Sequence, residues 1–99
     1  MAKIVRFHEY GDPDVLRIED LEHPAPTADE VQVTVNAIGL NRAEVMFRRN
    51  AYLQDAVFPS RLGYEASGIV SAVGAAVEGY EEGDVVSIIP TLDMARWGT

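Results

Sequence analysis

The sequence contains no cysteine, and its only histidines, His8 and His23, are fifteen residues apart. Without cysteine the chain can form no disulfide, and it offers no thiolate for catalysis, for zinc or for an iron–sulfur cluster. Two histidines at this spacing are also a poor basis for a metal site. We therefore expect no zinc and no metal chemistry.

Long hydrophobic runs are missing too. No apolar run approaches the 18 residues that span a bilayer, and residues 1–12 lack the apolar stretch of a secretory signal. Glycine and proline together number only 13, and 47% of the residues are hydrophobic, which is typical of a folded domain. Ninety-nine residues suffice for one core. We expect a cytoplasmic protein with one domain and no membrane partner.

Basic residues are scarce, with 8 Lys and Arg against 16 Asp and Glu, a net charge of −8. This balance opposes binding to nucleic acids. Residues 42–61 nevertheless hold four arginines against two acids, a net of +2, which leaves −10 for the rest. This basic island suits the phosphate of a cofactor. Alternatively it is the solvated face of a short helix on which Glu44 and Arg48 pair at i, i+4.

Short stretches of alternating polar and apolar residues, separated by glycine and proline, predict five strands. No helix of 10–15 residues separates them, so the expected fold is mostly β, a barrel or sandwich. The fifth strand is nearly all apolar and is expected to be buried on both faces. The predicted strands are Lys3–Glu9, Leu16–Glu22, Glu30–Ala37, Gly68–Val73 and Asp84–Ile89.

One short helix is predicted over Arg42–Arg49. Asn41 is expected to cap its N-terminus, and Glu44 stands three residues on, where it would complete a capping box. The inward face of this helix would carry Ala43, Met46 and Phe47.

The most specific pattern lies between residues 62 and 86 and has the spacing G-x-E-x-x-G-x(5)-G-x-x-V-x(5)-G-D-x-V. Its glycines, Gly63, Gly68, Gly74 and Gly83, stand where a strand must turn or where another backbone must approach closely. The pattern is not a phosphate-binding loop, because it contains no G-x-G-x-x-G and no long helix follows it.

With this spacing the chain resembles the zinc-free, ζ-crystallin-like quinone oxidoreductase branch of the medium-chain dehydrogenase/reductase superfamily. The resemblance extends over essentially the whole chain, including Lys3-Ile4-Val5, Gly39-Leu40-Asn41 and Trp97-Gly98-Thr99. It implies a GroES-like, partly open β-barrel with one short helix. Residues 1–99 would be the N-terminal part of this catalytic domain, and a nucleotide-binding Rossmann domain would lie further along the same protein.

The resemblance also implies an activity. An NADPH-dependent, homodimeric enzyme would pass hydride from the nicotinamide to a quinone or an α,β-unsaturated carbonyl compound. NADPH would be held mainly by the Rossmann domain, so this chain alone is expected to be inactive. Two alternatives remain open: an enoyl-thioester reductase of the same superfamily, and a GroES-like binding module without enzymatic activity.

The zinc-dependent relatives differ from this sequence at their metal ligands. Tyr64 stands where those relatives have a zinc-binding histidine, and their zinc cysteine falls near Asn41. Only Glu65 remains, and one carboxylate cannot hold zinc. Its expected role is structural, as a hydrogen-bond acceptor in a partly buried turn.

The resemblance places five residues at the substrate and cofactor cleft, although none is a certain catalytic residue. Asn41 is either a cofactor and substrate neighbour or a helix cap, and Tyr52 either lines the quinone pocket or is an ordinary loop aromatic. Met46 stands where relatives have a pocket tyrosine, but a core position is favoured. Arg48 serves a cofactor phosphate or, preferably, pairs with Glu44. Tyr64 is expected to fill the cleft floor.

A docking face for the missing domain is predicted on the helix and the loop that follows it. The loop Asn50–Leu62 is expected to be the most mobile interior segment. The apolar side chains expected to lie exposed on this face are Met46, Phe47, Tyr52, Leu53, Val57 and Phe58.

Overall fold

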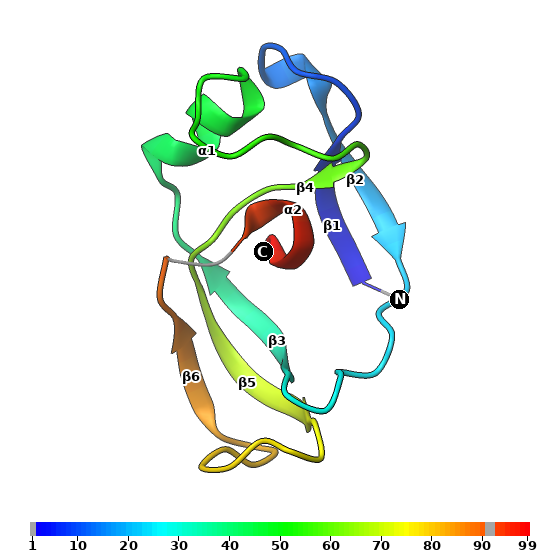
Figure 1. The fold of residues 1–99 in the computed structure, drawn as a ribbon, viewed down its shortest axis with the longest axis vertical. Helices are drawn as coiled ribbons and strands as arrows, with labels where there is room; N and C mark the ends of the chain where they lie inside the picture. Colours follow the sequence, from blue (N-terminus) through cyan, green and yellow to red (C-terminus); the bar gives the residue numbers. More distant parts are fainter. Residues whose placement is uncertain (1, 91–92) are drawn as a thin grey trace.

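The protein consists of two three-stranded antiparallel sheets that do not close into a full barrel (Figure 1). We describe a computed structural model, which covers residues 2–90 and 93–99. The first sheet has the order β2 (Leu16–Leu21), β1 (Ala2–Phe7), β4 (Ser60–Arg61), and the second has the order β3 (Val31–Ile38), β5 (Ala66–Val73), β6 (Val85–Ile88). The expectation of a mostly β, partly open GroES-like barrel is confirmed.

All five predicted strands are present within about two residues of their expected bounds. The pattern missed β4, because two residues are too few for any alternation. Helix α1 (Arg42–Arg48) forms where it was expected. The sequence did not indicate η1 (Pro13–Val15) or the single-turn helix α2 (Met94–Trp97). Within the described ranges, no helix is long and apolar enough to cross a membrane.

The prediction that the last strand is buried on both faces is wrong. Among the described strands, β6 lies at the edge of its sheet and pairs only with β5. Its Val85 side chain is 84% exposed, and none of its residues is fully buried. An apolar run shows that a strand is suited to burial, but it does not show whether residues 1–99 include the segments that would pack against that strand.

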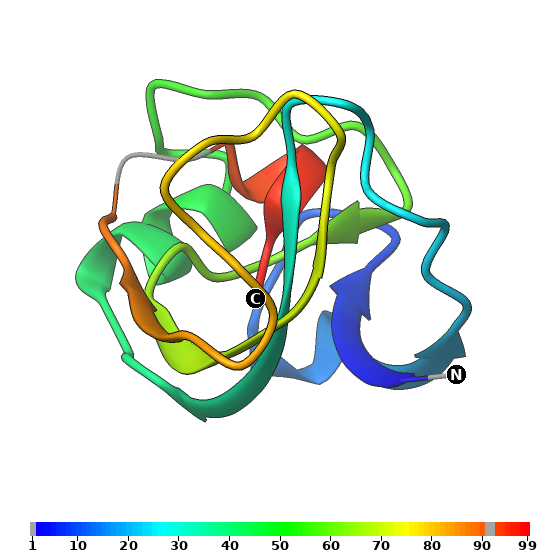
Figure 2. The same cartoon turned by 90° about the horizontal axis from the view of Figure 1, so that it is seen from below.

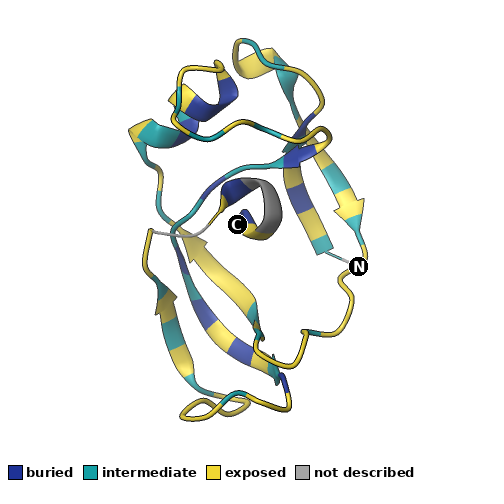
Figure 3. Cartoon of the chain, viewed as in Figure 1, coloured by how far each residue is buried: buried dark blue, intermediate teal, exposed yellow. Residues whose placement is uncertain are grey.

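The core lies at the α1 end of the molecule, where the first sheet meets the two helices (Figure 3). Phe7 of β1, Phe47 of α1 and Met94 of α2 are completely buried. The rings of Phe7 and Phe47 meet edge to face, with centroids 5.5 Å apart, a favourable aromatic geometry. Half-buried side chains surround these three: Tyr10, Val15, Leu16, Tyr52, Ala56, Leu62 and Tyr64.

The second sheet is covered much less than the first. Viewed from below, β1 and β2 lie on one side of the molecule and β6 on the other (Figure 2). On β3, Val31 and Val35 are both exposed. The accessible surface of the described protein is 6525 Å², whereas a compact monomer of this mass has about 5,500 Å². The excess is the area that an incompletely covered sheet would leave open.

Candidate functional site

Asn41 joins the start of α1 to the segment that leads into β5. It has the extended backbone of an N-cap residue, φ −133° and ψ 149°, but its side chain makes no capping hydrogen bond. Instead, Asn41 Nδ2 donates to Glu65 Oε2 at 2.7 Å. The capping prediction is therefore wrong for the side chain: a cap would accept a helix N–H through Oδ1, and here the side chain is oriented by the bond from its Nδ2 atom to the Glu65 carboxylate. The Asn41 carbonyl still accepts from Glu44 N at 3.1 Å.

Glu65 is fixed by its backbone as well as by its carboxylate. Its carbonyl oxygen accepts a hydrogen bond from Gly39 N at 3.0 Å. A Cβ added to Gly39 would overlap the Glu65 carboxylate, so a side chain at this position would displace that carboxylate. The structural, hydrogen-bonding role predicted for Glu65 is confirmed.

Glu44 is the residue of this site that the sequence interpretation placed wrongly. It is only 9% exposed, and its Oε1 atom is buried without a hydrogen-bond partner. Burial raises the pKa of the Glu44 carboxyl, the backbone of Asn41 opposes this shift, and the charge of Glu65 adds to it. Glu44 is thus buried near a second carboxylate, that of Glu65, and does not lie on a solvated face of the helix.

The favoured pairing of Arg48 with Glu44 is also wrong. Arg48 is buried, and its Nη1 atom donates to the Gly11 carbonyl oxygen at 2.5 Å. Gly11 N in turn donates to the Arg48 carbonyl oxygen at 3.0 Å. Among the described residues, no ion pair joins Glu44 to Arg48. Arg48 thus ties the end of α1 to the turn that follows β1, and its suggested contact with a cofactor phosphate stays a prediction.

The other residues expected at the cleft lie around the aromatic core. Tyr52 and Tyr64 are half-buried against it, and the Tyr52 ring meets Phe47 edge to face at 6.3 Å. The core position favoured for Met46 is wrong, because its side chain is 37% exposed on α1. The predicted docking face is wrong for Phe47, which is completely buried, and Tyr52 is only half exposed; Leu53 and Val57 are 93% and 74% exposed.

The basic island does not act as one group. Arg49 approaches Asp12 at 3.7 Å, whereas Arg61 lines a different part of the molecule. The four arginines are therefore close in sequence but do not form a single anion-binding site.

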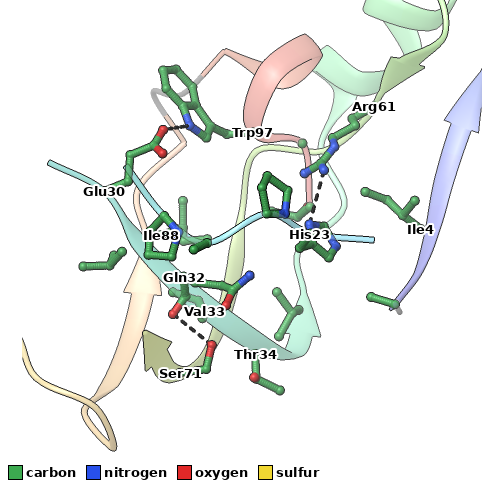
Figure 4. A pocket seen from close by; sticks show the side chains of 18 of the residues that line it. Ile4, His23, Glu30, Gln32, Val33, Thr34, Arg61, Ser71, Ile88 and Trp97 are labelled. Carbon is green, nitrogen blue, oxygen red and sulfur yellow. Dashed lines mark hydrogen bonds between the residues drawn. The ribbon is translucent and has the colours of Figure 1, made fainter. Parts of the chain in front are cut away.

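A groove of about 1140 Å³ opens between β1 and β3 (Figure 4). Across it, Arg61 Nη2 lies 3.3 Å from His23 Nδ1, and Trp97 Nε1 donates to Glu30 Oε2 at 3.0 Å. Burial lowers the pKa of His23, and the charge of Arg61 lowers it further. The sequence assigned His23 no role, because its partner Arg61 is 38 residues away.

No cluster of three or more His, Cys, Asp or Glu suited to a metal ion occurs in the part of the chain that the structure describes. The polar groups of the candidate site are the Asn41 amide, the carboxyls of Glu44 and Glu65, and the nearby Tyr64. They can accept and donate hydrogen bonds and can hold a proton.

Comparison with known proteins places this fold and site in a class. Residues 27–98 match the family described as the alcohol dehydrogenase GroES-like domain, and the chain belongs to this family. Its relatives include quinone oxidoreductases of the medium-chain dehydrogenase/reductase superfamily, which confirms the resemblance stated from the sequence. Quinone oxidoreductase 1 of Escherichia coli K12 is 40% identical over 86 residues, which are 87% of this chain and 26% of that protein.

Solved structures agree with this assignment. The Escherichia coli quinone oxidoreductase complexed with NADPH superimposes with a TM-score of 0.83 at 38% identity, covering 87% of this chain and 26% of that one. An NAD-dependent alcohol dehydrogenase superimposes with a TM-score of 0.85 at 38% identity, covering 97% of this chain and 28% of that one. The chain thus spans about a quarter of the length of these proteins.

Proposed function

We propose that the natural protein containing this chain is a zinc-free, NADPH-dependent oxidoreductase that passes hydride to quinones or α,β-unsaturated carbonyl compounds. The observation that carries the proposal is the similarity in sequence and backbone to a quinone oxidoreductase whose structure holds NADPH. The enzyme would be cytoplasmic and homodimeric.

In this proposal the chain is the N-terminal, substrate-side part of a GroES-like catalytic domain. The described helices are short, and the sequence has no glycine-rich phosphate loop, so these residues do not fit the nucleotide-holding side of a cofactor site. They fit the other side, where the Asn41 amide and the tyrosines around it would face the reacting groups. A Rossmann domain in the same protein would hold NADPH, which supplies the hydride when bound.

The preference for an activated acceptor follows from the chemistry of the residues. The sequence has no cysteine, Asn41 and Tyr64 are not zinc ligands in any common site, and Glu65 is engaged with Asn41. Without a metal to polarise a carbonyl, a substrate whose conjugation delocalises the developing charge is easier to reduce than a simple ketone.

The extra accessible surface supports the view that this chain is one part of a larger domain. The open second sheet and the groove beside β3 are where further chain would complete the barrel, and Leu53 and Val57 are where a second domain would dock.

The test is a comparison of the natural protein with the 99-residue chain. Oxidation of NADPH is followed with and without a simple 1,4-quinone, and NADH and a simple alcohol with NADP⁺ are measured as controls. We expect quinone-dependent oxidation by the natural protein and none by the chain alone, because hydride transfer needs donor and acceptor held about 3–3.5 Å apart. Quinone reduction by the isolated chain, or its absence in the natural protein, would overturn the proposal.

A further inference from the structure

The groove between β1 and β3 is bordered by the edges of these two strands (Figure 4). Residues 31–35 of β3 line it without a gap, and so do residues 2–4 of β1. Successive side chains of a strand point to opposite faces of its sheet, so consecutive residues border one space only where the strand turns its edge toward that space. The walls of the groove are therefore backbone as well as side chains.

The edge of β3 at the groove has backbone groups that do not reach β5. Val33 lies directly opposite Val70 of β5. Val70 N donates to Asp84 O and Val70 O accepts from Gly83 N, both at 2.9 Å, so the groups of Val70 point away from β3. Directly opposite residues of an antiparallel pair turn their backbone groups either both inward or both outward. The N–H and C=O of Val33 thus point away from β5.

The even-numbered residues agree with this alternation. The carbonyl oxygen of Glu30, just before β3, accepts from Gly74 N at 2.8 Å, and Gln32 O accepts from Ser71 Oγ at 3.3 Å. These carbonyls face β5, so the backbone groups of the odd-numbered residues 31, 33 and 35 face the other way. Among the described strands, only β5 pairs with β3. The odd-numbered residues therefore offer their N–H and C=O groups to the groove.

The facing wall has a free edge as well. Strand β4 pairs with β1 only at Arg6 and Phe7. In the described part of the chain, residues 2–5 of β1 have no strand beside them on the β4 side, although β2 pairs with all of β1 on the other side. Arg61 of β4 lines the groove, which places the groove on this unpaired side.

Two free edges across one groove restrict what can fill it. A backbone N–H or C=O that is buried without a hydrogen bond costs free energy. An occupant that covers both walls must therefore supply donors and acceptors on its two sides. An extended β-strand does this, because its backbone groups point alternately to one side and to the other.

We propose that the groove takes up one β-strand, which pairs with β3 on one side and with residues 2–5 of β1 on the other, and that this strand is the segment that follows Thr99 in the natural protein. Thr99 lines the groove, and its N–H donates to Gly63 O at 3.3 Å, so chain that continues from it begins inside the groove. The 99 residues span about a quarter of the length of the relatives. The inference rests on the part of the proposed function that makes this chain one piece of a larger domain, and it does not depend on the reaction.

The first test adds the strand as a peptide. The ¹⁵N-labelled 99-residue chain is titrated with a synthetic peptide of the about 12 residues that follow Thr99 in the natural protein, long enough for a strand of ordinary length. A scrambled peptide of the same composition is the control. Binding is read from the fluorescence of Trp97, the only tryptophan, which lines the groove and is 42% exposed. We expect a blue shift with the natural peptide and none with the scrambled one.

Hydrogen exchange in the complex shows which edge is used. The amides of Val31, Val33 and Val35 should exchange at least about 10-fold more slowly with the peptide bound, because they gain partners. The amides of Gln32 and Thr34 should change little, because they already face β5. No binding, or equal slowing of odd- and even-numbered amides, would overturn the proposal.

Two methylated peptides test whether both walls are used. Methylation of a peptide nitrogen removes its proton, and methylation of every second nitrogen blocks one side of the strand. We expect each of the two alternate sets to abolish binding, because one set faces β3 and the other faces β1. If either methylated peptide binds as well as the unmodified one, the strand pairs with one wall only and the proposed bridge is wrong.

The natural protein gives a second, independent measurement. The amides of Val31, Val33 and Val35 should exchange slowly in it and fast in the 99-residue chain. Val33→Pro removes an N–H that faces the groove and no bond to β5, and Val33→Ala is the matched control for the lost side chain. The stability difference between these two variants should be larger in the natural protein than in the chain. Fast exchange of the three wild-type amides in the natural protein would overturn the proposal.

The outcomes separate the possible occupants and the two proposals. If the 99-residue chain is a dimer in which the three odd-numbered amides are already protected, a second copy fills the groove and the proposed occupant is wrong. Quinone reduction enters none of these measurements. Slow odd-numbered amides in a natural protein that reduces no quinone would leave the strand assignment standing while the proposed function fails, and fast ones in an active quinone reductase would do the reverse.

Discussion

The Asn41 amide and the Glu65 carboxylate form the bond that connects the helix to the second sheet, over a distance of 2.7 Å and across 24 positions of sequence. Such a bond between a neutral donor and a charged acceptor is stronger than one between two neutral groups. Asn41 thus stabilises the fold by reaching another element, and it does not act by capping its own helix.

Replacement of Asn41 distinguishes these two roles. Asn41→Ala removes both, whereas Asn41→Ser keeps a good capping residue that is too short to reach Glu65. We expect both variants to lower the free energy of unfolding by about 1.5–3 kcal/mol, the usual contribution of a hydrogen bond to a charged group. The measurement is urea unfolding followed by circular dichroism. A serine variant as stable as the wild type would show that capping is the dominant role.

The sequence predicted the positions of strands and turns better than it predicted which faces of the strands are buried. The four glycines of the motif were expected where a strand turns or where another backbone approaches. At Gly68 and Gly74 the structure shows a close approach, because an added Cβ would overlap the carbonyl oxygens of Thr34 and Thr27 respectively. Gly63 and Gly83 have positive φ, as turns require. These are local requirements of the chain, and they are visible in its spacing.

Gly68→Ala tests the close approach of β5 to β3. The added methyl group would meet the backbone of Thr34, which cannot move without breaking the strand pairing. We expect a loss of about 1–3 kcal/mol in the free energy of unfolding, the usual cost of overpacking. Ser67→Ala, one position earlier in the same strand, is the control and should change stability much less. Equal losses in both variants would argue against the close approach as the cause.

The candidate site was predicted less well, for physical reasons. Glu44 and Arg48 have the spacing of a surface ion pair, yet both are buried and they do not pair with each other. Arg48 donates to the Gly11 carbonyl oxygen, and the charge of Glu65 acts on Glu44. Gly11 and Glu65 are distant in sequence, and helical spacing reports only the neighbours on one helix. The burial of β6 was predicted wrongly for a related reason, because the composition of a strand does not reveal which segments cover it.

His23 makes the stability of the groove dependent on pH. Its pKa is lowered by burial and by Arg61, so the folded chain binds fewer protons there than the unfolded chain. Stability should therefore fall as the pH drops through about 6.5, the ordinary value for histidine, toward the lower folded value. The urea midpoint at pH 7.5, 6.5 and 5.5 measures this. His23→Gln should flatten the decrease; a decrease unchanged in His23→Gln would exclude His23 as the cause.

Metal content is a separate prediction from the residues around Tyr64. We expect well under one zinc per chain after purification without chelators, because the sequence supplies no cysteine and has a tyrosine, Tyr64, where the resemblance implies a zinc-binding histidine in zinc-dependent enzymes. Elemental analysis of the dialysed protein measures the ratio. A Tyr64→His variant is the comparison, and it should also stay below one zinc per chain, since a single histidine beside Glu65 leaves the ligand set incomplete. One zinc retained by the wild type would contradict the proposal of a zinc-free enzyme.

The loop over residues 50–62 is expected to exchange its amide hydrogens faster than the paired strands. Outside β4 it has no strand pairing, and Leu53 and Val57 project into solvent. One position should differ: Ala56 N donates to the Tyr10 hydroxyl at 2.9 Å, and the Tyr10 ring packs against Phe58 with centroids 4.9 Å apart.

Hydrogen exchange followed by NMR tests this pattern residue by residue. The amides of residues 50–55 should exchange well before those of Val31–Val35 and Val85–Ile88 that bond to β5, and Ala56 should be slower than its neighbours. In Tyr10→Phe the ring packing is kept but the hydroxyl is lost, so the Ala56 amide alone should become fast while the strand amides keep their rates. If the whole loop is as protected as the strands, its apolar side chains belong to a rigid surface, and the loop is then not a segment that becomes ordered when another domain docks.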